Sequence, residues 1–199
     1  MHPLAFISDN WQKWLPALIV ICAIVWLVLF RSAPTSEQAI FTAMLVIYMI
    51  HQNEEHFWPG GFRQFANARV FKSGDADWPV TEGGVALVNI GYVWLPIALA
   101  ALFPGPLRWL GLGWVGLTLI NAITHIATTI RFRTYNPGLI TSIVLFLPFT
   151  IWALWYEHAH GMLTGPHIAM LLVAGVLLQL PVAALFVVPY RRAREIRPA

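Results

Sequence analysis

Six long apolar segments limit this chain to one class of fold, a bundle of membrane-spanning helices. Each segment is close to the ~20 residues that an α-helix needs to cross a hydrocarbon core about 30 Å thick. Of the 199 residues, 58% are hydrophobic and only 11% are charged, whereas about a quarter are charged in a soluble domain. Within lipid the backbone must satisfy its own hydrogen bonds, which favours helices. The predicted spans are residues 14–30, 39–56, 83–103, 107–130, 138–156 and 168–189.

The positions of the basic residues predict how these helices are oriented. Lys and Arg are enriched in cytoplasmic segments. With six spans, one side of the membrane holds ten of the 12 basic residues, and the other holds only Arg31 and Arg108. We therefore expect an all-α helix bundle in a bacterial-type inner (plasma) membrane, with both termini in the cytoplasm. The ten residues on that side are Lys13, Arg63, Arg69, Lys72, Arg131, Arg133, Arg191, Arg192, Arg194 and Arg197.

The chain shows no internal repeat, and we expect a single membrane domain over residues 1–199. Its one long loop is the predicted cytoplasmic loop 57–82, where Phe62, Phe65 and Arg69 lie at helical spacing. This spacing is compatible with a short helix on the membrane surface or with an ordinary polar loop. A single cysteine excludes an internal disulfide. Because the net charge of +3 follows the membrane topology, it does not indicate nucleic-acid binding, and the expected partners are lipids.

Ionisable residues within the spans form one candidate cluster. Such residues cost at least ~2.5 kcal/mol at the centre of a bilayer and are usually functional. Glu54 and Glu55 follow His51 by three and four residues near the end of the second span, so all three side chains point to one helix face. Asn121 and His125 are four residues apart in the fourth span. The predicted topology brings both sets to the same depth on the cytoplasmic side.

Two imidazoles and two carboxylates close together suit a divalent metal ion. Helix bundles build such sites from a His and a Glu one turn apart, plus a ligand from another helix. Two His and one carboxylate are a common set for zinc and for non-haem iron. We therefore predict zinc or iron bound by His51, Glu54, Glu55 and His125. A carboxylate that is not a ligand, Glu54 or Glu55, would act as the general base, and Asn121 would orient a ligand or substrate.

Other readings of these residues remain open. The end of the second span can be an interfacial polar cap, and His125 can bond across helices as a core residue. Asn53 and His56 point away from His51 and are not expected in the cluster, whereas Asn89 in the third span is undecided. A second group of histidines lies in the outer loop, but its spacing matches no standard zinc or copper site. That group is Glu157, His158, His160 and His167.

Three short motifs resemble those of a known family. His51-Gln-Asn-Glu54-Glu55 resembles the motif that names the HXXEE family of integral membrane proteins, which also shows Asn-x-x-x-His and Tyr-x-Pro-Gly. Here Asn121-Ala-Ile-Thr-His125 and Tyr135-Asn-Pro-Gly138 follow in that order. The resemblance implies a multi-pass protein with enzymatic activity, and it identifies neither a metal nor a substrate. It points to His51, Glu54, Glu55, Asn121, His125, Tyr135, Pro137 and Gly138.

Tyr135 can serve as a catalytic hydroxyl donor or simply begin the turn into the fifth helix. The leading hypothesis for function is a metal-dependent membrane enzyme, a hydrolase or oxidoreductase, that acts on an apolar or lipid-like substrate at the cytoplasmic side. Its catalytic candidates are Glu54, Tyr135 and Asn121.

Two alternative functions are a metal-free acid–base isomerase or cyclase of a sterol- or terpene-like substrate, and a proton- or cation-coupled transporter. The lack of an internal repeat counts against the transporter. The sequence does not define the oligomeric state.

Overall fold

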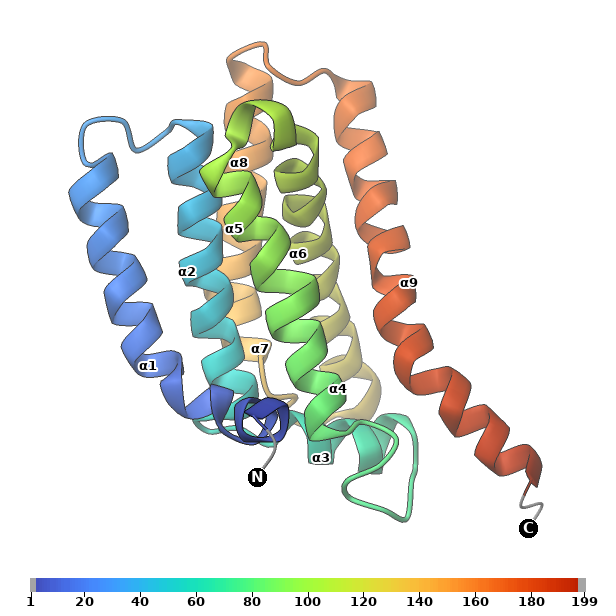
Figure 1. Ribbon diagram of the computed structural model, residues 1–199. Coiled ribbons are helices and arrows are strands. Elements are labelled where there is room, and N and C mark those ends of the chain that lie inside the picture. The colour runs from blue at the N-terminus through green and yellow to red at the C-terminus, as the bar shows by residue number, and fades with distance from the viewer. Residues whose placement is uncertain (1–2, 197–199) are drawn as a thin grey trace.

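The structure is a computed structural model that describes residues 3–196, and every regular element in that range is a helix. Four long helices are α1 (Pro3–Phe30), α2 (Glu37–His56), α6 (Pro104–Phe132) and α9 (Gly165–Ile196). Two further rods each run through a π-helical segment: α4 (Glu82–Ala86), η2 (Leu87–Trp94) and α5 (Leu95–Leu102), then α7 (Leu139–Thr141), η3 (Ser142–Phe146) and α8 (Leu147–Ala159). These rods stand side by side, and a shorter helix lies across their lower end (Figure 1).

Five of the rods are long and apolar enough to cross a membrane. They are Phe6–Phe30, Glu82–Leu102, Pro104–Phe132, Leu139–Ala159 and Gly165–Glu195. The prediction of an all-α, multi-pass membrane protein is therefore confirmed. The 20-residue α2, which carries three glutamates, is not among the five, although it contacts α1 and α5 within the bundle. The sixth span, the bounds of the spans and the cytoplasmic location of the termini stay predictions.

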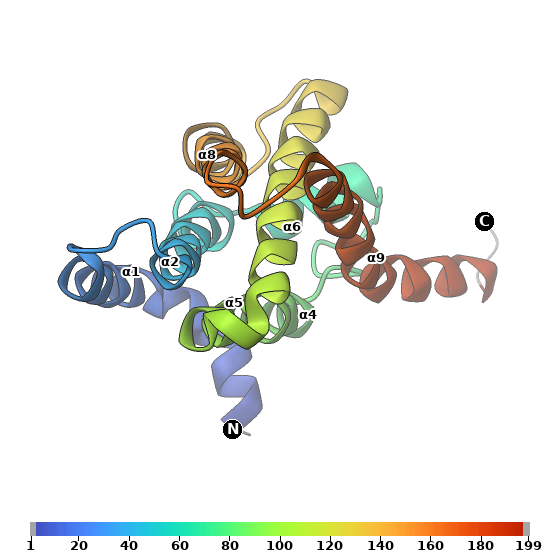
Figure 2. The same cartoon turned by 90° about the horizontal axis from the view of Figure 1, so that it is seen from above.

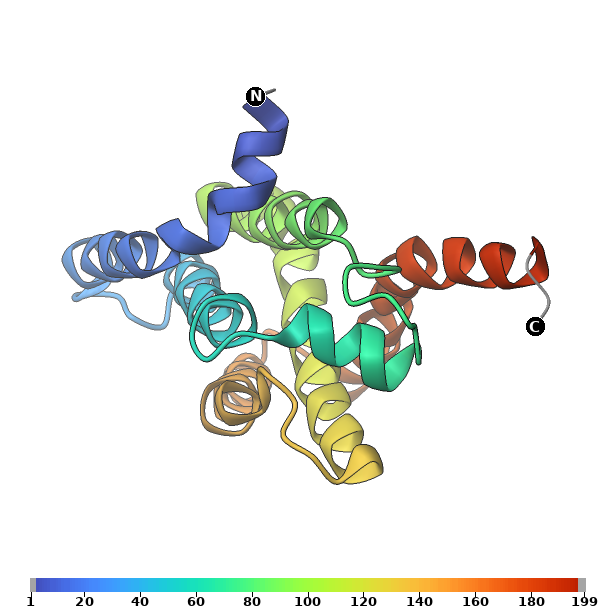
Figure 3. The same ribbon diagram turned by 90° about the horizontal axis from the view of Figure 1, so that it is seen from below.

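The helix that contains the first predicted span is longer than that span. α1 begins at Pro3, and its first turns bend beneath the bundle (Figures 1 and 3). Pro16 lies within this helix, and a proline inside a helix removes one backbone hydrogen bond and favours a kink. Trp11, on the bent part, is buried in a cluster with Met49 and Val85. The beginning of α1 therefore covers the lower end of the bundle.

The core of the bundle surrounds the middle of α2. Phe41 and Met44 are fully buried in one cluster with Ile97 of α5, Leu112 of α6 and Phe146 of η3. The last two turns of α2 are just as buried but polar. Since buried polar groups are costly without hydrogen-bond partners, the surrounding helices must supply partners for this end of α2.

The predicted loop 57–82 contains the short helix that lies across the lower end. It consists of α3 (Phe62–Phe65) and η1 (Ala66–Val70) and runs across the ends of the long rods (Figure 3). The buried Asn67 ties the following segment to this helix, donating to the carbonyls of Ala76 (2.8 Å) and Val80 (3.0 Å) and accepting from the Val80 amide (2.9 Å). A helix is thus present at the predicted place, and its contact with the membrane surface stays a prediction.

The helix α9 approaches α6 closely at two glycines. A Cβ atom at Gly116 would lie 2.3 Å from the Leu171 carbonyl oxygen, and one at Gly175 would lie 2.5 Å from Gly116. Small residues at helix contacts allow this kind of approach in membranes. Below the contact α9 diverges from the bundle, and its end points away (Figures 1 and 2).

We predict that Gly116→Ala destabilises the chain and that Gly113→Ala does not. The methyl group at 116 forces α6 and α9 apart, at a cost of about 1–3 kcal/mol. A Cβ at Gly113 would meet only Leu178 Cδ1 at 3.7 Å, an ordinary contact. Thermal unfolding in detergent, followed by tryptophan fluorescence, measures both variants. Equal melting temperatures would contradict the tight contact.

Candidate functional site

The site lies where the ends of α2 and α6 meet the beginning of α7. His51, Glu55 and His125 are 0%, 6% and 3% exposed. One ligand atom from each lies within 4.8 Å of the other two. Glu55 is central, because its Oε2 is 3.5 Å from His51 Nε2 and its Oε1 is 3.2 Å from His125 Nε2. The structure therefore assembles three of the four predicted ligands around one point.

Gly138 allows the two imidazoles to come together. It has φ of +98°, and a Cβ there would lie 2.6 Å from His125 Cε1 and 2.8 Å from His51 Cε1. Both the left-handed backbone and the lack of space require glycine. The ring of His51 is held on another side by Phe146, with ring centroids 4.1 Å apart. The Tyr-x-Pro-Gly motif thus forms part of the wall of the site.

The predicted ligand Glu54 points to a different set of partners. Its Oε1 accepts hydrogen bonds from the Tyr135 hydroxyl (2.6 Å) and the Ile140 amide (3.0 Å). Its Oε2 accepts from the Thr141 amide (2.7 Å) and the Thr141 hydroxyl (2.5 Å). These amides belong to the first turn of a helix. The N–H groups of a first turn have no acceptor within their own helix, and the helix dipole favours a negative charge beside them. Glu54 therefore caps the helix that begins at α7.

The bonds of Glu54 also indicate which ring nitrogen of His51 acts as a hydrogen-bond donor. The Thr141 hydroxyl gives its hydrogen to Glu54, so its oxygen must accept the 2.8 Å bond from His51 Nδ1. Nδ1 then carries a hydrogen, and in the neutral imidazole Nε2 presents a lone pair. Nε2 is buried and makes no hydrogen bond to any described residue. A lone pair that faces a carboxylate calls for a cation or a proton between them.

His56, which was not expected in the cluster, contacts it through Glu55. His56 Nε2 lies 3.4 Å from Glu55 Oε2 and 2.9 Å from Asn89 Nδ2. Asn89 Oδ1 in turn accepts from Gln52 Nε2 at 2.9 Å, and Trp94 Nε1 donates to Gln52 Oε1. The helical positions relative to His51 did not reveal this, because the Glu55 side chain lies between the two histidines. The undecided Asn89 belongs to this network.

The catalytic candidate Tyr135 lies in the turn between α6 and α7. The pKa of the Tyr135 hydroxyl is raised above its usual value. The main cause is partial burial, and the second is the nearby negative charge of Glu54, to which the hydroxyl donates a hydrogen bond. The hydroxyl thus stays protonated and acts as a donor to Glu54. The other candidate, Asn121, lies with His125 in the wall of a cavity.

That cavity, the chamber, has a volume of about 400 Å³ and is mostly apolar. Glu55 and His125 lie in its wall, so it reaches two of the three assembled residues. Its apolar wall includes Phe62, Phe65 and Phe71 from the loop, Val88, Tyr92 and Val93 from η2, Leu117 from α6, and Val182, Phe186 and Val187 from α9.

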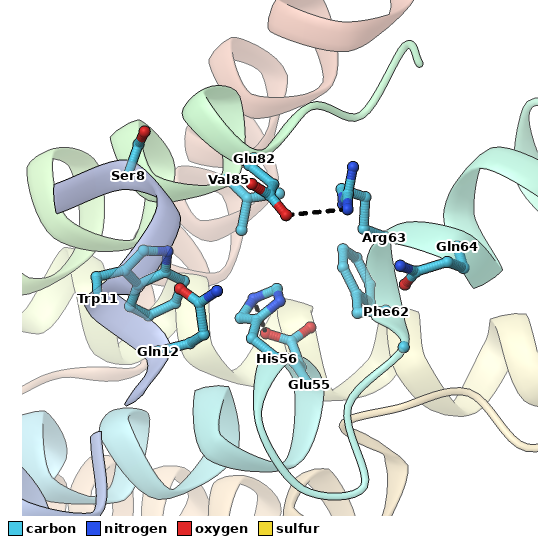
Figure 4. A pocket seen from close by; sticks show the side chains of 11 residues that line it. Ser8, Trp11, Gln12, Glu55, His56, Phe62, Arg63, Gln64, Glu82 and Val85 are labelled. Carbon is cyan, nitrogen blue, oxygen red and sulfur yellow. Dashed lines mark hydrogen bonds and ion pairs between the residues drawn. The ribbon is translucent and has the colours of Figure 1, made fainter. Parts of the chain in front are cut away.

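A second, polar cavity of about 140 Å³, the vestibule, reaches Glu55 from another direction. Figure 4 shows it between Trp11 and Gln12 on one side and Phe62 and Arg63 on the other. Arg63 donates to Glu82 at 3.0 Å across its rim. Four residues, Glu55, His56, Phe62 and Val85, line both cavities. The assembled residues therefore have an apolar access and a polar access.

The histidines around the loop between α8 and α9 are not brought together in the same way. Glu157 binds Arg108 at 2.5 Å. His158 Nδ1 and His160 Nδ1 bond the carbonyls of Leu163 and Tyr156, each at 2.8 Å, and His167 Nδ1 accepts from the Thr164 amide at 3.2 Å. Within residues 3–196, the three-residue group that places its ligand atoms together is the one around Glu55.

A family described as proteins of unknown function with an HXXEE motif matches residues 42–153 of this chain. The matched region contains all three motifs and all three assembled residues. No curated protein and no solved structure gave a significant match.

We predict that Gly138→Ala disrupts the site. Its Cβ would overlap both imidazoles, so the loss of stability should exceed the ~1–3 kcal/mol expected for a strained backbone alone. The matched control is Gly161→Ala, because Gly161 has φ of +72° but a Cβ there would have no neighbouring atom within 4 Å. Thermal unfolding of both variants separates overlap from backbone strain. Similar losses would show that the imidazoles do not depend on Gly138.

Proposed function

Since this chain belongs to the HXXEE family, whose function is unknown, we propose that it is a metal-dependent membrane enzyme with a divalent ion held by His51, Glu55 and His125. The observation that carries this proposal is the convergence of three buried ligand atoms within 4.8 Å of one another, two of them from residues that line an apolar chamber. Buried ionisable groups in a membrane protein are costly, and a shared cation offsets that cost.

The donor set fits zinc or iron. Two imidazole nitrogens and one carboxylate form the open three-ligand sets of catalytic zinc and of non-haem iron. The hydrogen bond from His51 Nδ1 to Thr141 is the kind of outer contact that orients a metal-binding histidine. A bound ion would supply a Lewis acid that polarises an oxygen atom of the substrate.

The remaining predicted residues have supporting roles in this proposal. Glu54 accepts four hydrogen bonds, which favours a positioning role over those of ligand or general base. It holds Thr141, and Thr141 holds His51. Asn121 lies in the chamber wall beside His125 and would orient the substrate. Tyr135 acts through Glu54 and is a positioning residue as well.

The two cavities support an apolar or lipid-like substrate. The chamber wall is formed in part by α9, whose outward side chains are exposed as expected for contact with lipid. An apolar molecule would enter the chamber from the bilayer. The polar vestibule would bring water to Glu55, which supports a reaction that consumes water, such as hydrolysis.

Metal content tests the ligand set. We expect zinc or iron to copurify with the chain in mild detergent, without a polyhistidine tag or chelator, and to be measurable by plasma mass spectrometry. His51→Ala, His125→Ala and Glu55→Gln should each lose most of the metal, because a three-ligand site with one ligand removed binds weakly. His158→Ala and His160→Ala, in the outer loop, are matched controls that should keep it.

Retention of metal in all three site variants would refute the ligand set. A chain that stays free of metal after reloading would instead favour a metal-free acid–base enzyme. His51 Nε2 and Glu55 Oε2, 3.5 Å apart, also place an acid and a base side by side, and activity that survives chelation would support that second function.

A further inference from the structure

Basic residues without an ion pair gather where the loop that follows η1 meets α9. Elsewhere in the bundle, Arg63 and Arg108 each bind two carboxylates. In contrast, Lys72 of the loop and Arg191 and Arg194 of α9 are exposed and form no ion pair with any residue from 3 to 196. We call these three residues the basic cluster. Exposed cations that no carboxylate neutralises are available to an anion from outside the chain.

Tyr190 joins the two segments that carry the basic cluster. Its hydroxyl donates to the carbonyl of Phe71, the residue before Lys72. Its ring centroid lies 5.2 Å from that of Phe71 and 5.5 Å from that of Trp78. On α9 itself, the guanidinium carbon of Arg194 lies 5.8 Å from the Tyr190 ring centroid. The loop and the end of α9 are therefore held against each other (Figure 3).

The backbone of Lys72 does not account for a lysine at this position. Lys72 has φ of +51°, a left-handed conformation. The next amide, that of Ser73, donates back to the Asn67 carbonyl at 2.9 Å, which is a typical way to end a helix and usually involves glycine or asparagine. Glycine would adopt this turn at less cost. The shape of the turn thus leaves the charged side chain unexplained.

One side of α9 continues from the chamber into the basic cluster. Ala183, Phe186 and Val187 line the chamber. Arg191 follows Val187 by four residues and Arg194 follows it by seven, so both arginines lie on the side of the helix that lines the chamber. A molecule lying along this side of α9 would meet apolar side chains first and positive charges next.

The charge of this region is positive overall. Arg192 adds a fourth exposed cation beside the basic cluster. The neighbouring acids Asp75 and Glu195 form no ion pair with a described residue, whereas Asp77 is bound to Arg63. Four basic residues therefore stand against two free acidic ones. The partner that fits this surface is an amphiphile with a negative head.

We propose that one anionic phospholipid binds along this side of α9, with its phosphate against the basic cluster and an acyl chain in the chamber. Phosphate oxygens accept charge-assisted hydrogen bonds from guanidinium and ammonium groups. The chamber, of about 400 Å³, leads the chain towards Glu55 and is in the size range of small-molecule sites. The inference rests on the proposed function for the apolar occupant of the chamber. It adds the charge of the polar end and requires no metal ion.

The first test compares two lipids on the native chain. The chain in mild detergent is titrated with dioleoyl phosphatidylglycerol or dioleoyl phosphatidylcholine, and native mass spectrometry measures the bound fraction. We expect phosphatidylglycerol to bind about tenfold more tightly, because its phosphate carries no compensating ammonium group. Exposed charges are screened by salt, so the preference should shrink as ammonium acetate is raised. Equal affinities at low salt would overturn the proposal without relying on any variant.

The second test removes one charge without straining the backbone. Lys72→Gly should lower the affinity for phosphatidylglycerol about fivefold, leave that for phosphatidylcholine unchanged, and not lower the melting temperature. The matched control is Arg133→Gly. Arg133 is also basic, with φ of +50° at the end of α6, and the ends of α6 and α9 lie well apart (Figures 2 and 3). Equal effects of the two variants would show that the basic cluster is not the site.

The third test concerns the acyl chain. Ala183→Trp should fill part of the chamber and weaken the binding of both lipids alike. Ala184→Trp is the control, because Ala184 is exposed on the same helix and does not line the chamber. Unchanged binding of both lipids to Ala183→Trp would refute the position of the chain.

Metal analysis of the same samples separates this inference from the proposed enzyme. A preference for phosphatidylglycerol in a chain without metal, lost in Lys72→Gly, would uphold the lipid site and contradict the metal-dependent function. Bound metal with no preference between the lipids would overturn the lipid site alone.

Discussion

The rest of the site depends on one interaction, the hydrogen bonds that the Glu54 carboxylate accepts from the first turn of α7. They join α2 to the rod that continues through η3 and α8. They also orient the Thr141 hydroxyl, which in turn orients His51. A buried carboxylate is costly by itself, and the orphan amides of a helix start are costly too. Each satisfies the other, so a helix junction and the donor role of His51 Nδ1 follow from one contact.

The sequence predicted the central residues because they follow from two simple rules. The helical period places His51 and Glu55 on one face, and the alternating direction of the spans places His125 at the same depth. The separate partners of Glu54 and Glu55 do not follow from these rules. Both residues lie beside the His51 face, and only the position of α7, a tertiary feature, decides which one contacts the second histidine.

Other features were missed for related physical reasons. His56 lies off the predicted helix face, yet the Glu55 carboxylate reaches it. The burial of Asn136 was not predicted either, because an asparagine before proline is common in exposed turns. The π-helical segments η2 and η3 shift the register of side chains, and a period of 3.6 residues cannot reveal them. Apolar composition alone predicts neither the chamber nor the vestibule, because cavities arise from how helices diverge.

The helix α9 forms one side of the chamber. It lies wholly outside the matched region 42–153, yet it supplies Gln179, Val182, Ala183, Phe186 and Val187 to the chamber wall. The three assembled residues and Gly138 all lie inside the matched region. One side of the chamber wall therefore lies outside the matched region, whereas the rest of that wall lies inside it. Substitutions in the last helix can therefore reshape one side of the chamber without altering His51, Glu55 or His125.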